Sequence, residues 1–74
     1  MLSIDILAPI LRTELAKRNC HPATISMDDD LANIGFDSSS VLRVISELED
    51  QFELDYSAMT NGIWKVSDIA KLVP

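Results

Sequence analysis

The feature that most limits the fold of this chain is how rarely glycine and proline interrupt it. The 74 residues include two glycines and three prolines, and neither type occurs between residues 36 and 61. A β-rich chain needs many turns, and turns depend on these residue types. Of all residues, 47% are hydrophobic, which is enough for a folded core. The sequence therefore predicts an all-α fold.

The first segment carries an apolar stripe at helical spacing. The stripe comprises Ile4, Leu7, Ala8, Leu11 and Leu15, and it is widened by Ile6 and Ile10. Pro22 disfavours continuation, so we expect this helix to end near Arg18 or Asn19. Pro9 requires that the helix begins shortly before it, with Asp5 as a cap, or that the helix bends there.

The second helix is the clearest element. Its stripe comprises Val41, Ile45, Leu48 and Phe52, and it is broadened by Leu42 and Val44. Asp37 or Ser38 is a natural N-cap. We expect Phe52 and Leu48 to pack against Leu11 and Leu15 of the first helix. Residues 19–37, between the two helices, are expected to form a long loop in which Gly35 suits a turn.

The last part of the chain predicts two shorter elements. Residues 55–62 are expected to form a turn with a short helix that stops at Asn61 and Gly62. Residues 65–73 have helical spacing and are expected to form a last short helix. The predicted architecture is a small four-helix bundle, with three main helices and one short helix, in a single domain of residues 1–74.

The charge and the cysteine count restrict the partners and the compartment. The net charge of −6 disfavours nucleic acid and membrane surfaces and favours basic protein partners. Cys20 is the one cysteine, which excludes an internal disulfide framework. The first residues lack the basic and apolar regions of a secretory signal, and no window is long enough for a membrane span. We expect a monomer in the cytoplasm.

Most motifs that could carry chemistry are better explained by structural roles. Cys20 and His21 are adjacent, but adjacency alone makes neither a nucleophile–base pair nor a metal site. Residues 28–30 are aspartates without the spacing of a calcium loop, so we expect them to cap a turn. Trp64 is expected to pack its ring on the core. We expect no catalytic and no metal-binding residue.

Serines occupy positions 38, 39 and 40, directly at the expected start of the second helix. Backbone N–H groups and the helix macrodipole favour a negative group there, by about 0.3–1 kcal/mol at an exposed end. The local physics therefore permits a phosphodiester on Ser38 but does not require one. Ser39 and Ser40 are expected to satisfy backbone groups at the helix start.

The stretch "DLANIGFDSSSVLRVISELEDQFEL" resembles the signature of the acyl and peptidyl carrier proteins. The matching residues are Leu31, Ile34, Gly35, Asp37 and Ser38, followed without a gap by Leu48, Glu49 and Phe52. Near the end of the chain, Val66 and Ile69 match the closing segment of the family, where Lys65 replaces a threonine. The resemblance spans nearly the whole chain.

This resemblance implies a function. Ser38 falls on the attachment point of 4′-phosphopantetheine, which a separate phosphopantetheinyl transferase moves from coenzyme A with magnesium. The terminal thiol of the arm then carries an acyl or aminoacyl group as a thioester. A loading enzyme, either an adenylation enzyme or an acyltransferase, and later biosynthetic enzymes are the implied partners. The carrier itself catalyses nothing.

Two departures from the family pattern affect the choice of partners. Ser39 stands where the family usually has leucine, and Arg43 stands where fatty-acid carriers tend to have an acid. Both favour a discrete carrier of specialised metabolism over a housekeeping fatty-acid carrier. We expect partner enzymes to contact the start and exposed face of the second helix, at Asp37, Ser39, Arg43, Glu49 and Asp50. An unmodified adaptor of the same fold is the alternative, and an independent enzyme is the least supported.

Overall fold

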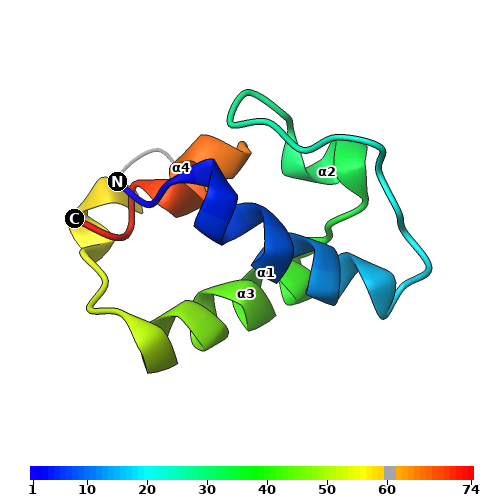
Figure 1. Cartoon of the computed structure of the whole chain (residues 1–74). Helices are drawn as coiled ribbons and strands as arrows, with labels where there is room; N and C mark the ends of the chain where they lie inside the picture. The colour runs from blue at the N-terminus through cyan, green and yellow to red at the C-terminus, as the bar shows by residue number, and fades with distance from the viewer. Residues whose placement is uncertain (60–61) are drawn as a thin grey trace.

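The computed structural model of the protein describes residues 1–59 and 62–74 (Figure 1). These residues form four α-helices and one 3₁₀ helix, and they contain no strand. The elements are α1 (Ile4–Ala16), α2 (Leu31–Ile34), α3 (Ser38–Gln51), η1 (Tyr56–Met59) and α4 (Val66–Ala70). The predicted all-α bundle is confirmed. No helix of the described residues is long and apolar enough to cross a membrane.

Helix α1 begins one turn before Pro9 and continues through it. The expectation that Asp5 caps this helix is wrong. Ser3 is the N-cap because its extended backbone places its carbonyl to accept the Leu7 N–H at 3.0 Å. Pro9 is the sixth residue of the helix and removes one backbone hydrogen bond without ending it.

The end of α1 is fixed by Asn19 rather than by Pro22. Asn19 has a φ of 57°, a left-handed conformation that asparagine tolerates better than most residues. The Cys20 N–H donates to the Leu15 carbonyl at 3.0 Å, and the Asn19 N–H donates to the Ala16 carbonyl at 3.1 Å. These two bonds form a Schellman motif, which closes the helix, and its last residue, Ala16, lies two residues before the expected end near Arg18.

The expectation of a continuous loop over residues 19–37 is wrong, because α2 forms inside it. This single turn is held by tertiary contacts that local sequence does not reveal. The Leu31 N–H donates to the Trp64 carbonyl at 2.9 Å, and Asp30 forms an isolated antiparallel bridge with Lys65. The stretch of chain before α2 is thereby attached to the chain before α4.

Gly35 ends α2 and is required for two reasons. Its φ of 118° is unfavourable for any residue with a Cβ. A Cβ there would also lie 2.8 Å from the Cys20 Sγ and 3.2 Å from a Leu15 methyl carbon. The predicted turn at Gly35 is confirmed, and the absence of a side chain there allows the loop to pass close to the end of α1.

Helices α1 and α3 pack against each other and enclose most of the core with α4 (Figure 1). The buried cluster comprises Leu2, Leu7, Leu11, Leu15, Leu31, Phe36, Val44, Leu48, Val66, Ile69 and Ala70. Phe52 is only partly buried and packs at the edge of this cluster. Ile6 does not widen the buried stripe, since it is 50% exposed on the outer side of α1.

The expectation that Leu42 broadens the buried face of α3 is wrong, because Leu42 is 64% exposed. It lies one turn after Ser38, on the side of the helix that Ser38 occupies, whereas Val44 and Leu48 face the core. Leu42 therefore belongs to the surface around the start of α3.

The short elements after α3 complete the globule. The predicted short helix is confirmed as η1, although Asn61 of its expected stop signal lies outside the described residues. The last helix is shorter than residues 65–73, because α4 ends at Ala70. The Leu2 N–H donates to the Ala70 carbonyl at 3.0 Å, which holds the two ends of the chain close together (Figure 1).

Candidate functional site

The three consecutive serines occupy different environments at the first turn of α3. Ser38 is exposed, and its hydroxyl has no hydrogen-bond partner among the described residues. The Ser39 hydroxyl is also exposed but donates to Asp37 Oδ1 at 3.2 Å. Ser40 is fully buried. Successive residues point about 100° apart around a helix, so Ser38 and Ser40 point in directions about 200° apart.

Asp37 and Ser40 form a reciprocal cap on the start of α3. The Ser40 N–H donates to Asp37 Oδ1 at 2.9 Å, and the Asp37 N–H donates to Ser40 Oγ at 2.9 Å. This is a capping box in which serine takes the place of the usual acid or amide at the third helical residue. The prediction of Asp37 as N-cap is confirmed, and the backbone at Ser38 is fixed on both sides.

Arg18 joins this cap from the turn after α1. Its Nη1 lies 2.8 Å from Asp37 Oδ1 and also donates to Ser40 Oγ at 2.8 Å. The hydrogen bond from Arg18, followed by those from the Ser40 N–H and hydroxyl, holds the pKa of Asp37 well below its usual range. The same carboxylate raises the pKa of Arg18. Asp37 is therefore ionised and paired at neutral pH.

The geometry around Ser38 fits a covalently attached phosphodiester. The hydroxyl is accessible, and it stands at the N-terminus of a helix of 14 residues. The Ser40 N–H is taken by Asp37, but the N–H groups of Ser38 and Ser39 have no partner within the described residues. These open donors and the macrodipole favour a negative group at this position.

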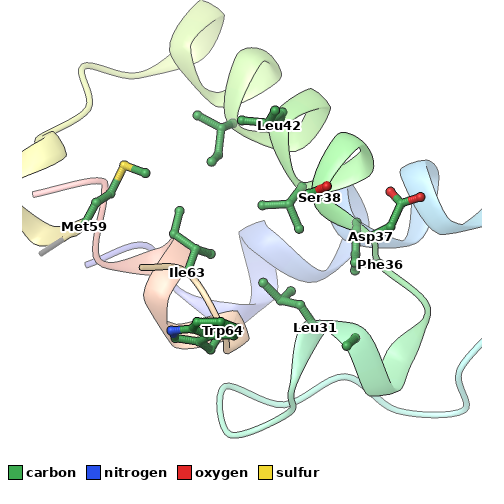
Figure 2. A pocket seen from close by; sticks show the side chains of 11 residues that line it. Leu31, Phe36, Asp37, Ser38, Leu42, Met59, Ile63 and Trp64 are labelled. Atoms are coloured by element: carbon green, nitrogen blue, oxygen red, sulfur yellow. The ribbon is translucent and has the colours of Figure 1, made fainter. Parts of the chain in front are cut away.

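An open apolar groove of about 420 Å³ begins at Ser38 and runs between α3, α2 and the segment before α4 (Figure 2). Its lining residues are Leu31, Ala32, Phe36, Asp37, Ser38, Val41, Leu42, Ile45, Met59, Ile63 and Trp64. Trp64 is 72% exposed, so the expectation that its ring packs on the core is wrong. Its ring instead forms part of the wall of the groove, opposite α3 (Figure 2).

The other residues expected to face partners are all exposed. Ser39, Arg43, Glu49 and Asp50 lie on α3, and Asp37 precedes it. Arg43 Nη1 lies 3.5 Å from Glu14 Oε1 of α1, with its own side chain 65% exposed. A hydrogen bond to Glu49 raises the pKa of Tyr56 in η1. The five expected residues therefore extend from the start of α3 along its outer side.

The remaining motifs have local roles. The Ser26 N–H donates to Asp29 Oδ2 at 2.8 Å, so Asp29 caps a local turn as expected. The Asp30 side chain makes no cap hydrogen bond and accepts one from the Asn33 side chain at 3.4 Å. Cys20 is half-buried against Gly35. Within the described residues, no three His, Cys, Asp or Glu side chains are grouped so that they could hold a metal ion.

Sequence reasoning missed two charged residues of α1 and the turn after it. Glu14 is 4% exposed and pairs with Lys17 at 3.1 Å and with Arg43. Its position three residues after Leu11 places it on the buried stripe, and this spacing was the available signal. Arg18 gave no such signal, because only the fold brings it to Asp37.

The comparison with known families agrees with this geometry. The family model described as the phosphopantetheine attachment site matches residues 7–72, so the chain belongs to the family of phosphopantetheine-binding carrier domains. Members of this family hold 4′-phosphopantetheine covalently, and they are generally carriers that interact with phosphopantetheinyl transferases and biosynthetic enzymes. No curated protein and no solved structure matched the chain.

Proposed function

We propose that this protein is a carrier that holds an acyl or aminoacyl group as a thioester on a 4′-phosphopantetheine arm attached to Ser38. One observation carries the choice of serine. Of the three serines at the start of α3, only Ser38 has a hydroxyl that is both exposed and without a hydrogen-bond partner within the described residues. Ser39 and Ser40 are bonded to Asp37.

The attachment uses chemistry that a separate transferase provides. The Ser38 Oγ forms a bond to phosphorus, the bond to the nucleotide part of coenzyme A breaks, and the hydroxyl proton passes to the transferase. The protein contributes an accessible nucleophile on a rigid turn. When bound, the arm supplies a terminal thiol that forms the thioester with the cargo.

The role is that of a single non-catalytic domain, residues 1–74, acting as a monomer in the cytoplasm. Its partners are the transferase, a loading enzyme and downstream biosynthetic enzymes, and they include no nucleic acid and no membrane. The net charge of −6 supports protein partners with basic surfaces. Ser39 and Arg43 support a pathway of specialised metabolism, because both are exposed where partners approach Ser38.

The groove beside Ser38 supports an apolar cargo of modest size. Its walls are aliphatic and aromatic side chains, and its near end is formed by Ser38 itself (Figure 2). An acyl chain on the arm can therefore fold back onto apolar surface instead of remaining in water.

Intact mass spectrometry tests this function. The wild-type protein, incubated with a phosphopantetheinyl transferase, coenzyme A and magnesium, should gain the mass of one phosphopantetheine group. Ser38→Ala should gain none, whereas Ser39→Ala, the same change at the neighbouring residue, should be modified. Circular dichroism should show all three proteins helical. An unmodified wild-type protein would support the adaptor alternative instead.

A further inference from the structure

Arg18 contacts residues that are distant from it along the chain. It lies in the turn after α1, yet its guanidinium reaches the N-cap of α3, a separation of 19 residues along the chain to Asp37. Nη1 contacts both members of the capping box, at 2.8 Å from Asp37 Oδ1 and 2.8 Å from Ser40 Oγ. The Arg18 side chain is 33% exposed, so part of it is removed from solvent.

The contact matters because Ser38 comes directly after Asp37 in the chain. The phosphodiester of an arm on Ser38 adds a second negative charge beside the Asp37 carboxylate. Two like charges at this separation repel each other, and the repulsion is weakly screened over a few ångströms. Arg18 is the one cation paired with Asp37 among the described residues.

We propose that Arg18 is a positioning residue for attachment at Ser38, an inference that rests on the proposed function of that serine. Arg18 acts through Asp37 and Ser40 in two ways. It fixes the first turn of α3 and thereby the backbone that carries Ser38. It also neutralises the N-cap carboxylate, so that the anionic arm is accepted beside it at a small electrostatic cost.

A purely structural role for Arg18 would have a different signature. Loss of a contact that only joins the turn after α1 to the start of α3 lowers the stability of the unmodified and modified proteins equally. If Arg18 compensates the charge of the phosphodiester, its loss destabilises the modified protein more than the unmodified protein. The change in melting temperature on attachment therefore separates the two roles.

The experiment compares Arg18→Gln with Arg12→Gln, a matched control. Arg12 lies on α1 and also makes two hydrogen bonds, but these go to the Pro22 and Ala23 carbonyls. Transferase kinetics are measured by the mass gain, with the carrier as the varied substrate. Melting temperatures are measured with and without the arm, at low and high salt.

We expect Arg18→Gln to lower kcat of attachment about fivefold with KM within about twofold, because the nucleophile is less well held. Its melting temperature should fall on attachment by about 2–4 °C more than that of wild type at low salt. The excess should shrink at high salt. Arg12→Gln should match wild type in both quantities.

Two further variants keep the test decisive if Arg18→Gln folds poorly. Arg18→Lys keeps the positive charge and should retain the wild-type change in melting temperature on attachment. Asp37→Asn keeps a capping side chain but removes the repelling charge. Combined with Arg18→Gln, it should abolish the excess destabilisation by the arm.

Equal shifts on attachment in wild type and Arg18→Gln, with equal kcat, would overturn the inference and leave the proposed function intact. A loss confined to KM would also overturn it, because that result indicates direct contact with the transferase. A wild-type protein that takes up no arm, or takes it up on another residue, would overturn both.

Discussion

The three consecutive serines lie in three different environments. The backbone geometry of the helix determines which serine is buried and which are exposed. The helical rotation turns Ser40 into the core, where its hydroxyl completes a cap, and leaves Ser38 facing solvent. Asp37 Oδ1 accepts hydrogen bonds from Arg18, Ser39 and Ser40. The proposed attachment at Ser38 thus uses the one serine of the three whose hydroxyl is not bonded to Asp37 within the described residues.

The paired state of Asp37 predicts a specific dependence of stability on pH. Its folded-state pKa is lowered below that of the unfolded chain, mainly by Arg18 and then by Ser40. The unfolded state therefore binds more protons as the pH falls below about 4, and stability is lost there. The stabilising contribution of Asp37 is fully present above about pH 5, where the carboxyl is ionised in both the folded and the unfolded state.

The measurement is thermal unfolding of wild type and Asp37→Asn between about pH 3 and pH 7. The stability difference between the two proteins should be constant above about pH 5 and should shrink below about pH 4. Asp28→Asn, which removes an exposed carboxylate in the loop before α2, controls for the change in net charge. A difference that stays constant to pH 3 would show that Asp37 is not paired in the folded protein.

Among the elements, α1 and α3 were predictable, the short helices η1 and α4 were predicted with less exact bounds, and α2 was not predicted. Both long helices carry apolar stripes over several turns, and Asp37 is a strong N-cap signal. Helix α2 has four residues, too few for any periodicity, and its Leu31 N–H bonds to the Trp64 carbonyl. Such an element forms because the rest of the molecule supplies its partners, so local sequence cannot predict it.

The packing of α3 predicts a contrast between two leucines of the same helix. Leu48 is fully buried within the core cluster, whereas Leu42 is 64% exposed. Leu48→Ala should lower the free energy of unfolding by about 2–5 kcal/mol, because it leaves a cavity. In so small a domain this is a large part of the total stability.

Urea denaturation checks this contrast, with Leu42→Ala as the control for the same chemical change. Leu42→Ala should cost well under about 1 kcal/mol, the size of an ordinary surface substitution. Phe52→Ala should fall between the two, because Phe52 is only partly buried. Equal losses for Leu42→Ala and Leu48→Ala would contradict the assignment of the buried face.

On the scale of the whole molecule, the groove begins at Ser38, and the exposed acids Glu49 and Asp50 lie near the other end of the same helix. The groove depends on Met59, Ile63 and Trp64, which follow α3 at a distance in the sequence. No local pattern indicated that these residues would face Leu42 across an open space. The proposed attachment serine belongs to a contiguous sequence motif, whereas the groove beside it is a product of the tertiary fold.

The fluorescence of Trp64 can be used to probe the groove, because Trp64 is the one tryptophan of the chain and is 72% exposed. Loading the arm with a medium-length acyl chain should cover the indole and shift its fluorescence emission to shorter wavelength. Loading with an acetyl group, which is too short to reach far along the groove, is the matched control. Identical emission from the two loaded forms would show that the cargo does not lie on this surface.

The exposed acids near the end of α3 lead to a prediction about how partner enzymes approach the protein. Glu49 and Asp50 are exposed on the helix that begins at Ser38, in a chain of net charge −6. Reversing both to lysine should slow modification by the transferase and by the cognate loading enzyme at low salt. The effect should weaken as salt rises, because the screening length is about 10 Å at 0.1 M and shorter above that.

Reversal of Asp5 and Asp28, which are exposed on α1 and in the loop before α2, gives the same change in net charge elsewhere on the surface. That variant should be modified at close to the wild-type rate. Wild-type rates for the Glu49 and Asp50 reversal at low salt would show that these acids only keep the surface solvated.

The central claim is that the arm is attached to Ser38 and to neither of its neighbours. The most direct measurement is peptide fragmentation of the modified wild-type protein by mass spectrometry, which leaves all three serines in place. Fragments that break the chain between Ser38 and Ser39 should assign the added mass to Ser38. Added mass on Ser39, or on the buried Ser40, would contradict the account.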